Sequence, residues 1–265
     1  MLKQLRSLLA GARFGPVEVQ KIRQLTPNMK RITLKGEIIE GFGPDCAGAH
    51  FKLVVPSDGQ SSQSFAELIS AGDFKKRMRT YTVRAARPAI GEIDVDIVTH
   101  GDLGYVGPWA QRALEGDVIV VSRCGTPKLI TGGINRIIAA ADMTGFPALA
   151  AGLETLEEKV DVEACVEIAT PSDRQPFETV EGVKINWIVK PDCHAPGTEI
   201  IEAIKNLPPP DEQTSVFVAG EFSTVGQLRQ YFKTELGVDK SRSYISSYWK
   251  AGLDEPAHKI AKAAV

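Results

Sequence analysis

The hydrophobic pattern of this chain changes at Gly132-Gly133, and this change constrains the fold more than any other feature of the sequence. Before it, apolar and polar residues alternate over short runs that turn residues separate. After it, apolar residues form continuous runs, and a stretch with helical periodicity follows most of these runs. Alternation is typical of strands with one buried face, whereas continuous apolar runs are typical of parallel strands covered on both faces. We therefore expect two domains: an antiparallel Greek-key β-barrel in residues 1–130 and a doubly wound parallel α/β sheet in residues 131–265.

The first half contains six short alternating runs with turn signals between them, which predicts a barrel. The predicted strands are residues 17–22, 29–34, 50–55, 79–84, 93–98 and 117–122. Residues 65–78 are polar and charged, and we expect a surface loop with some helix there. The N-terminal stretch is expected to form a short amphipathic helix, because its apolar run at residues 8–10 is too short for a signal peptide.

In the second half, predicted strands alternate with predicted helices, which indicates a doubly wound sheet. The strands are residues 136–142, 160–168, 183–189, 214–220 and 243–248, and the helices are residues 147–159, 199–207 and 224–236. Residues 255–262 form a basic tail with helical spacing, in which Lys259 and Lys262 share one face.

The composition is that of an ordinary globular protein: of 265 residues, 31 are Lys or Arg and 33 are Asp or Glu, which leaves a net charge of −2. This balance gives no overall attraction to nucleic acid or to an anionic membrane. No apolar run reaches the roughly 20 residues of a membrane helix, so we expect a cytoplasmic protein, and a monomer. The cysteines at positions 46, 124, 165 and 193 are widely spaced, so we expect free thiols and neither a metal site nor a disulfide framework.

The segment Arg79-Thr80-Tyr81-Thr82-Val83-Arg84 carries the residues best suited to hold a cofactor. In a strand, Arg79 and Tyr81 share one face, and Thr82 and Arg84 share the other. The guanidinium fork of an arginine matches two oxygens of a pyrophosphate, and a tyrosine ring can lie flat on a flavin. A threonine offers its hydroxyl and backbone N–H to the flavin edge where a hydride enters. The alternation by itself leaves a second interpretation open, an edge strand with solvated arginines.

Two further segments have the chemistry of a nucleotide site. Gly107 precedes a predicted helix at residues 108–114, and a helix N-terminus suits the phosphates of FAD. Residues 142–147 follow the first strand of the α/β domain, which is the dinucleotide position of such folds. The G-x-G-x-x-G fingerprint is missing there, which argues against an ordinary Rossmann dehydrogenase.

Several single residues have two interpretations each. His100 is either a flavin ligand or a turn residue, and Arg174 either meets the 2′-phosphate of NADP or is a solvated loop residue. Trp249 either covers one face of the flavin, lines the substrate cleft, or packs between the domains. The sequence alone leaves these alternatives open.

The order and spacing of these segments resemble those of the siderophore-interacting proteins, ferric-siderophore reductases of the ferredoxin–NADP reductase superfamily. The resemblance covers nearly the whole chain. The matching segments are His50-Phe51-Lys52-Leu53-Val54-Val55-Pro56, the strand at 79–84, Thr99-His100-Gly101, Gly107-Pro108-Trp109-Ala110, Ala141-Asp142-Met143-Thr144-Gly145-Phe146-Pro147-Ala148, Ala219-Gly220-Glu221 and Tyr248-Trp249-Lys250-Ala251-Gly252.

The resemblance implies FAD as the cofactor and NADPH or NADH, or reduced ferredoxin, as the electron donor. The implied cofactor-binding residues are Arg79, Tyr81, Thr82, Val83, Arg84, Thr99, His100, Gly101, Gly107, Pro108, Trp109, Ala110, Asp142, Thr144, Pro147 and Trp249. It also implies a basic patch for a bulky, anionic ferric siderophore, with Lys52, Arg123, Lys128, Lys250, Lys259 and Lys262 as candidates. One basic position of the family falls on Cys124 here, which is a departure from the family's pattern.

The implied activity is the reduction of iron(III) in a ferric siderophore by electrons that pass from NAD(P)H through FAD. Iron(II) then leaves, because hard oxygen ligands hold it more weakly. The cofactor carries this chemistry, so no catalytic acid, base or nucleophile of the protein and no resident metal is expected. Two alternatives stay open: a flavin reductase that serves ferredoxin, flavodoxin or a quinone, and a non-enzymatic siderophore-binding protein.

Overall fold

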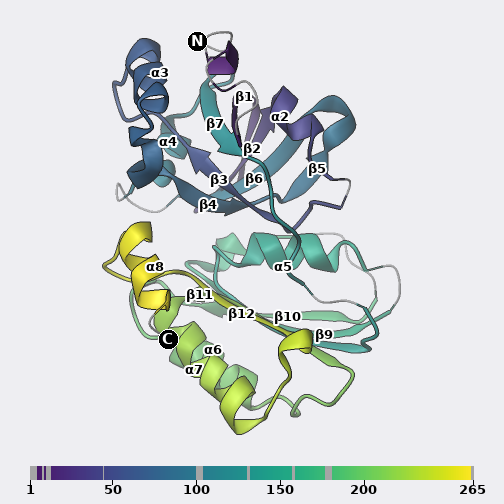
Figure 1. Cartoon of the computed structure of the whole chain (residues 1–265). Helices are drawn as coiled ribbons and strands as arrows, with labels where there is room; N and C mark the ends of the chain where they lie inside the picture. The colour runs from purple at the N-terminus through teal and green to yellow at the C-terminus, as the bar shows by residue number, and fades with distance from the viewer. Residues whose placement is uncertain are drawn as a thin grey trace. The chain divides into compact units, whose positions relative to one another are not determined.

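The computed structural model of this chain divides into two compact units, residues 1–127 and 128–265 (Figure 1). It describes residues 5–7, 9, 13–43, 45–99, 104–129, 132–156, 159–176 and 181–263, and of residues 75 and 76 only the backbone. In the described part of the chain, each unit has its own β-sheet and its own hydrophobic core.

The first unit is built on an antiparallel sheet of seven strands in the order β4-β3-β7-β1-β2-β6-β5. The strands are β1 (Phe14–Thr26), β2 (Met29–Lys35), β3 (His50–Val54), β4 (Arg79–Thr82), β5 (Ala85–Arg87), β6 (Glu92–Val98) and β7 (Val118–Ser122). All six strands predicted from alternation are confirmed. Alternation missed β5, because three residues are too few to show a period.

One chain segment closes this sheet into a barrel. β4 and β5 follow each other in the sequence but stand at opposite ends of the strand order. The change of partner falls on two residues: the Val83 N–H donates to the Ala49 carbonyl (2.8 Å), and the Arg84 N–H donates to the Asp94 carbonyl on β6 (2.8 Å). Inward-facing apolar residues fill the interior, among them Val17, Val19, Ile32, Leu34, Phe51, Val95 and Ile119. The predicted flavin segment is therefore held at the seam of the barrel.

The helices of the first unit are α2 (Glu37–Glu40), α3 (Ser62–Ser70) and α4 (Val106–Arg112), with a 3-10 turn at Asp73–Arg77. The expectation of a surface loop at 65–78 needs correction, because α3 buries Phe65, Ala66 and Ile69 in a small second core. The predicted N-terminal helix lies partly outside the described residues. Within them, Leu5 is fully buried.

Helix α4 lies two residues before its predicted position at 108–114. Pro108 falls inside its first turn, where the missing N–H of proline removes no helical hydrogen bond. The other end is held by Lys30 of β2, which donates to the carbonyls of Ala110 (3.0 Å) and Gln111 (2.9 Å). Such bonds satisfy carbonyls that have no partner within the helix.

The second unit is a parallel sheet of five strands in the order β10-β9-β8-β11-β12. The strands are β8 (Arg136–Ala141), β9 (Asp161–Ile168), β10 (Val183–Val189), β11 (Thr214–Glu221) and β12 (Ser243–Trp249), and every pairing among them is parallel. All five predicted strands are confirmed. The strand order reverses between β8 and β11, so the carboxyl ends of these two strands form the switch point where such sheets bind ligands.

Helices cover both faces of this sheet (Figure 1). They are α5 (Phe146–Leu153), α6 (Thr198–Lys205), α7 (Phe222–Arg229), which continues as a π-helical turn at Gln230–Glu235, and α8 (Glu255–Ala263). α5 covers one face, while α6 and α7 cover the other (Figure 1). α5 is shorter than the predicted 147–159, because the chain turns at Thr155, whose hydroxyl donates to the Gly152 carbonyl (2.7 Å).

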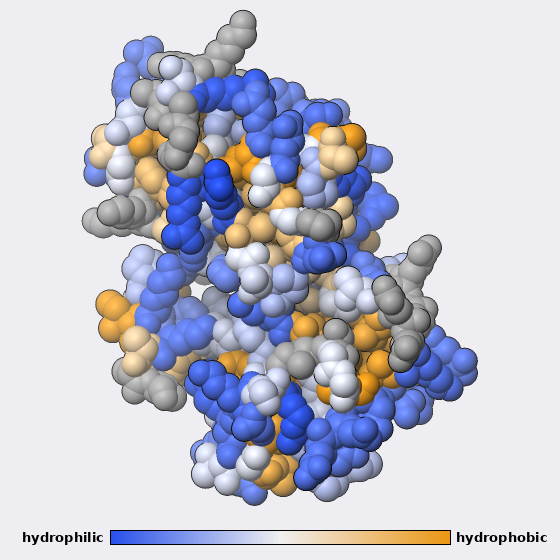
Figure 2. All heavy atoms as spheres, turned by 45° about the vertical axis from the view of Figure 1, so that its right-hand side comes forward, coloured by the Kyte–Doolittle hydropathy of each residue, from blue (hydrophilic) through white to orange (hydrophobic). Residues whose placement is uncertain are grey.

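The surface in Figure 2 is mostly hydrophilic, with apolar residues in small separate groups. The large apolar side chains that are exposed are Ile90, Tyr105, Leu114, Leu236, Leu253 and Ile260. Within the described ranges, no helix has both the length and the apolar character that a membrane crossing requires.

Candidate functional site

β4 offers an open edge at the place where the sequence predicts a flavin. It is the end strand of its sheet, and β3 is its ladder partner. Because the Val83 N–H bonds to Ala49 on the β3 side, the antiparallel ladder turns the N–H of Thr82 away from β3. This N–H therefore lies on the outer side of the β3–β4 pair. Its direction fits the prediction that Thr82 binds the reactive edge of a flavin.

Arg79 and Tyr81 are half-buried neighbours on one face of β4. The Arg79 guanidinium lies 5.0 Å from the centre of the Tyr105 ring and donates to the Met78 carbonyl (3.0 Å). Tyr81 packs against the barrel core. A guanidinium fork and an aromatic ring in fixed positions suit a pyrophosphate and a flat ring system. Both residues therefore have the chemistry that the sequence predicts for FAD binding, and their contact with FAD stays a prediction.

Arg84, the last residue of the motif, has a different environment. Its side chain is 6% exposed, and its Nε lies 3.6 Å from Oδ2 of Asp96. Asp96 is 1% exposed and accepts two bonds from Arg31, at 2.7 and 2.8 Å. Arg84 thus belongs to a buried ion cluster, and Val83 lies fully in the barrel core. Contact of these two residues with FAD stays a prediction.

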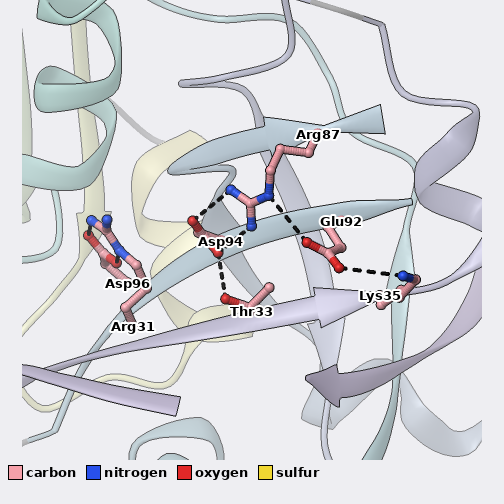
Figure 3. A network of polar contacts seen from close by, with 7 residues as sticks. All are labelled: Arg31, Thr33, Lys35, Arg87, Glu92, Asp94 and Asp96. Carbon is pink, nitrogen blue, oxygen red and sulfur yellow. Dashed lines mark hydrogen bonds and ion pairs between the residues drawn. The ribbon is translucent and has the colours of Figure 1, made fainter. Parts of the chain in front are cut away.

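A second cluster continues along β2, β5 and β6 (Figure 3). Arg87 donates to both carboxylate oxygens of Asp94 (3.0 and 2.9 Å), and the Thr33 hydroxyl donates to one of them (2.7 Å). Burial works against ionisation of Asp94, but the bonds from Arg87 and Thr33 outweigh it and lower the pKa of the carboxyl. Glu92 joins Arg87 (3.3 Å) to Lys35 (3.5 Å). Charged side chains therefore hold β5, which follows the flavin segment directly, against β6.

The α4 segment adds a buried donor to the barrel. Trp109 is 2% exposed, and its indole Nε1 has no hydrogen-bond partner among the described residues. Gly107, Pro108 and Ala110 lie in the same helix, and the Thr99 N–H donates to the Asn28 carbonyl (3.0 Å). The predicted ligands His100 and Gly101 lie outside the described residues. One buried donor without a partner among the described residues, the Trp109 indole, therefore lies in the unit that is predicted to bind FAD.

In the second unit, Asp142 organises the switch point. One carboxylate oxygen accepts from the Thr144 N–H (2.8 Å), the Thr144 hydroxyl (2.6 Å) and the Gly145 N–H (3.0 Å). The other accepts from the Trp249 indole (2.7 Å) at the end of β12. Three predicted cofactor residues are thus brought together, and the fourth, Pro147, is buried in the first turn of α5.

Glycines allow the loop after β8 to touch the end of β11. A Cβ at Gly145 would lie 2.4 Å from the Ala219 carbonyl oxygen, and a Cβ at Gly220 would lie 2.8 Å from Asp142 Oδ2. Neither position has room for a side chain. The floor of the switch point is therefore backbone, which leaves the polar atoms of Asp142 and Thr144 close to its surface.

Two carboxylates at this end of the sheet escaped sequence reasoning. Glu221 caps α7 through the N–H groups of Ser223 and Thr224 (2.5 and 3.3 Å). Glu167, at the end of β9, pairs with Lys190 (3.0 Å), and its second oxygen has no partner among the described residues. Burial raises the pKa of Glu167, against the attraction of Lys190. A charged residue near the carboxyl end of a continuous apolar run was the available signal.

The predicted basic residues are not all free charges. Lys52 hydrogen-bonds to Thr80, and Arg123 is exposed just after β7. Lys250 lies 4.3 Å from the centre of the Phe222 ring.

The remaining predicted cations lie in the second unit. Lys259 pairs with Glu255 (3.0 Å), and Lys262 donates to Ser246 Oγ (2.6 Å), which ties α8 to β12. Lys128 is half-buried, and Arg174 is exposed. A shared siderophore patch, and a contact of Arg174 with a 2′-phosphate, stay predictions.

Comparison with known proteins agrees with this picture. Residues 18–127 match the family described as siderophore-interacting FAD-binding domain, and residues 134–252 match the family described as siderophore-interacting protein. The ferric vibriobactin reductase ViuB of Vibrio cholerae is 31% identical, over 89% of this chain and 89% of that protein. The NADPH-dependent ferric-chelate reductase of Escherichia coli is 24% identical, over 90% of this chain and 94% of that protein.

Among solved structures, the siderophore-interacting protein SipS of Aeromonas hydrophila has a TM-score of 0.81 and 26% sequence identity. The alignment covers 95% of this chain and 97% of SipS. The predicted fold class, a barrel followed by a doubly wound sheet, and the predicted use of FAD are thereby confirmed. This chain belongs to the siderophore-interacting protein family and contains its FAD-binding domain.

Proposed function

We propose that this chain is an FAD-dependent reductase that takes electrons from NADPH or NADH and reduces iron(III) held by a siderophore, so that iron(II) is released. We assign FAD to residues 1–130 and the nicotinamide nucleotide to residues 131–265. The relatives' names, ferric vibriobactin reductase and NADPH-dependent ferric-chelate reductase, support this reaction. The observation that carries it is the outer edge of β4, where the Thr82 N–H is turned away from β3 and Tyr81 is the neighbouring residue.

In the barrel, the protein's part is to hold and orient. Arg79 presents its guanidinium to the pyrophosphate, Tyr81 gives its ring to one face of the isoalloxazine, and Thr82 donates to its N5 and O4 edge. FAD, when bound, supplies the conversion of a two-electron donor into single electrons. The ion clusters of Asp94 and Asp96 keep the strand in place while the cofactor changes its charge.

In the α/β domain, Asp142 fixes the Trp249 indole and the Thr144 hydroxyl at the switch point. We assign these two side chains to the nicotinamide end of the donor. The donor dissociates after each turnover, so its site needs groups that can exchange partners. The hydroxyl of Thr144 and the ring of Trp249 are such groups.

The acceptor is a bulky chelate that carries negative charge, and it calls for cations rather than a deep apolar pocket. We assign this role to Lys52, Lys250 and Arg123, with Lys128 as a further candidate. Lys259 and Lys262 have partners on α8 and β12, so they contribute charge rather than direct contacts.

An anaerobic titration of the full chain tests the proposal. The purified protein is loaded with FAD, reduced with NADPH, NADH or reduced ferredoxin in turn, and mixed with ferric hydroxamate and ferric catecholate siderophores. A ferrous-specific dye reports the iron(II) released. We expect one donor to bleach the flavin and a ferric siderophore to restore its colour with dye formation. Protein that stays colourless after incubation with FAD would overturn the assignment, and rapid cytochrome reduction without dye formation would favour a general flavin reductase.

A matched pair of variants separates a reductase from a mere siderophore binder. Tyr81→Phe keeps the ring and should retain the flavin spectrum, whereas Tyr81→Ala should lose FAD or shift its absorbance. Siderophore binding that persists in both variants, together with iron release that is equal in both, would contradict the role of this ring.

A further inference from the structure

Two of the four cysteines, Cys46 and Cys124, lie in the barrel unit, although they are far apart in the sequence. Cys46 is 3% exposed and packs in the barrel core, and Cys124 is half-buried against the same cluster. Each thiol also affects the pKa of the other. The two cysteines therefore lie near each other in the barrel, Cys46 within the core cluster and Cys124 at its half-buried edge.

The backbone around both cysteines is fixed. The Ala49 N–H donates to the Cys46 carbonyl (3.0 Å), and the Gly125 N–H donates to the His50 carbonyl (2.8 Å). A Cβ at Gly125 would lie 2.6 Å from the His50 ring, so the two segments run against each other without room for a side chain. This packing holds the thiols as a pair rather than as two independent loop residues.

The other two cysteines have no such arrangement. Cys165 lies buried in β9, and Cys193 lies half-buried in a loop of the second unit. A disulfide needs Cβ atoms about 3.5–4.5 Å apart. Among the described residues, Cys46 and Cys124 are the two cysteines that pack at the same core cluster and affect each other's pKa.

We propose that Cys46 and Cys124 are a modification site, a dithiol that hydrogen peroxide converts into an intramolecular disulfide. The Cys124 thiolate attacks the peroxide oxygen, the O–O bond breaks, and one water leaves after proton transfer. The Cys46 thiol then displaces the hydroxyl of the Cys124 sulfenic acid as a second water. The two sulfurs lose two electrons in total, and the peroxide gains them. A small thiol such as glutathione reverses the step by thiol–disulfide exchange.

The two sulfurs have unequal roles because their surroundings differ. Cys124 is the accessible one and begins the reaction, while Cys46 is buried and resolves it. Burial raises the pKa of the Cys46 thiol to about 12, with further contributions from Cys124 and Asp45. Burial also raises the pKa of Cys124, although the bond from Cys46 opposes this. Since the thiolate is the nucleophile, the disulfide should form slowly at neutral pH and faster as pH rises.

The location gives the bond a consequence for the flavin strand. It would join the segment before β3 to the segment after β7, and β3 is the strand that carries β4, with His50 opposite Thr82. Cys124 also stands where the family resemblance places a cation of the basic patch. Oxidation would therefore stiffen the barrel behind the flavin edge. This inference does not depend on which chelate the enzyme reduces.

Thiol counting on the full, FAD-loaded chain tests the pair. The reduced protein is treated with graded hydrogen peroxide, denatured, and assayed for free thiols. We expect the count to fall from four to two and dithiothreitol to restore it. Peptide mapping should find one cross-link, Cys46 to Cys124. The control variant C165S/C193S should still lose two thiols, whereas C46S and C124S should each lose the cross-link.

The wild-type peptide map decides the matter even where a variant folds poorly. Four thiols that survive a peroxide dose sufficient to oxidise the chain's methionines would overturn the proposal. So would a cross-link that involves Cys165 or Cys193, or a Cys124 that proceeds to sulfinic acid while Cys46 stays free.

Discussion

The barrel and the α/β unit hold their candidate ligand groups by different means. In the barrel, buried carboxylates bind arginines behind the flavin segment, as Asp96 does with Arg31 and Arg84. At the switch point, Asp142 is held by neutral donors: two N–H groups, a hydroxyl and an indole. The barrel's support is a buried pairing of opposite charges, whereas the donors at Asp142 carry no charge of their own. The proposed division of ligands, with FAD in the barrel and the nicotinamide nucleotide in the α/β unit, follows the same boundary.

Asp96→Asn should have the largest effect, because it breaks the barrel's means of support. It removes the buried carboxylate that pairs with both Arg31 and Arg84, and the loss of one partner of a buried ion pair costs about 3–5 kcal/mol in comparable cases. Lys35→Gln, on the exposed rim of the neighbouring cluster, should cost less than about 1 kcal/mol. Amide hydrogen exchange at β2 and β6 measures both changes within the barrel. Unchanged protection in Asp96→Asn would mean that the cluster does not hold the flavin strand.

Oxidation of the thiols should also affect the stability of the two units differently. Oxidation of the Cys46–Cys124 pair should stabilise the barrel by about 2–4 kcal/mol, because the cross-link restricts the unfolded chain. The second unit, with Cys165 and Cys193, should be unaffected. Denaturant unfolding of oxidised and reduced protein, followed by exchange in each unit, gives the two values. If oxidation still stabilised the barrel of the C46S variant, another oxidised group would be the cause of the stabilisation.

Trp249→Phe tests the neutral side of the comparison. It keeps an aromatic ring but removes the 2.7 Å bond to Asp142, whose carboxylate retains the donors of Thr144 and Gly145. We expect the KM for NADPH or NADH to rise about tenfold, as 1.4 kcal/mol of lost positioning would give. The FAD spectrum should not change. Loss of FAD in this variant would show that the two units do not divide the ligands as proposed.

Local periodicity was enough to predict the strands of both sheets, because alternating and continuous apolar runs depend only on which faces are buried. The deviations arose where tertiary contacts decide. α3 buries Phe65, Ala66 and Ile69, which have helical spacing in a segment that continues into charged residues, and α5 ends early at Thr155. One helical turn of apolar residues does not show whether that face will be covered.

The candidate site divides in the same way. Residue types and strand alternation predicted that Arg79 and Tyr81 would share a face of β4. They could not show that Arg84 turns to Asp96, or that Cys46 and Cys124 lie at the same core cluster, because each pair comes from segments that meet only in the folded barrel. Side-chain chemistry is local in sequence, but the choice of partner is not.

As pH falls, the stability of the two units should change by small amounts in opposite directions. Asp94 has a lowered pKa in the folded barrel, so its contribution to stability is complete above the unfolded value, about 3.9, and is lost as pH falls towards the folded one. Glu167 has a raised pKa, so the α/β unit gains stability as pH falls through the folded value towards about 4.3. Hydrogen exchange at β6 below about pH 3.9 and at β9 above about pH 4.3 should show opposite slopes. Asp94→Asn should flatten the first slope and Glu167→Gln the second, and parallel slopes in the wild type would show that other groups dominate the acid response.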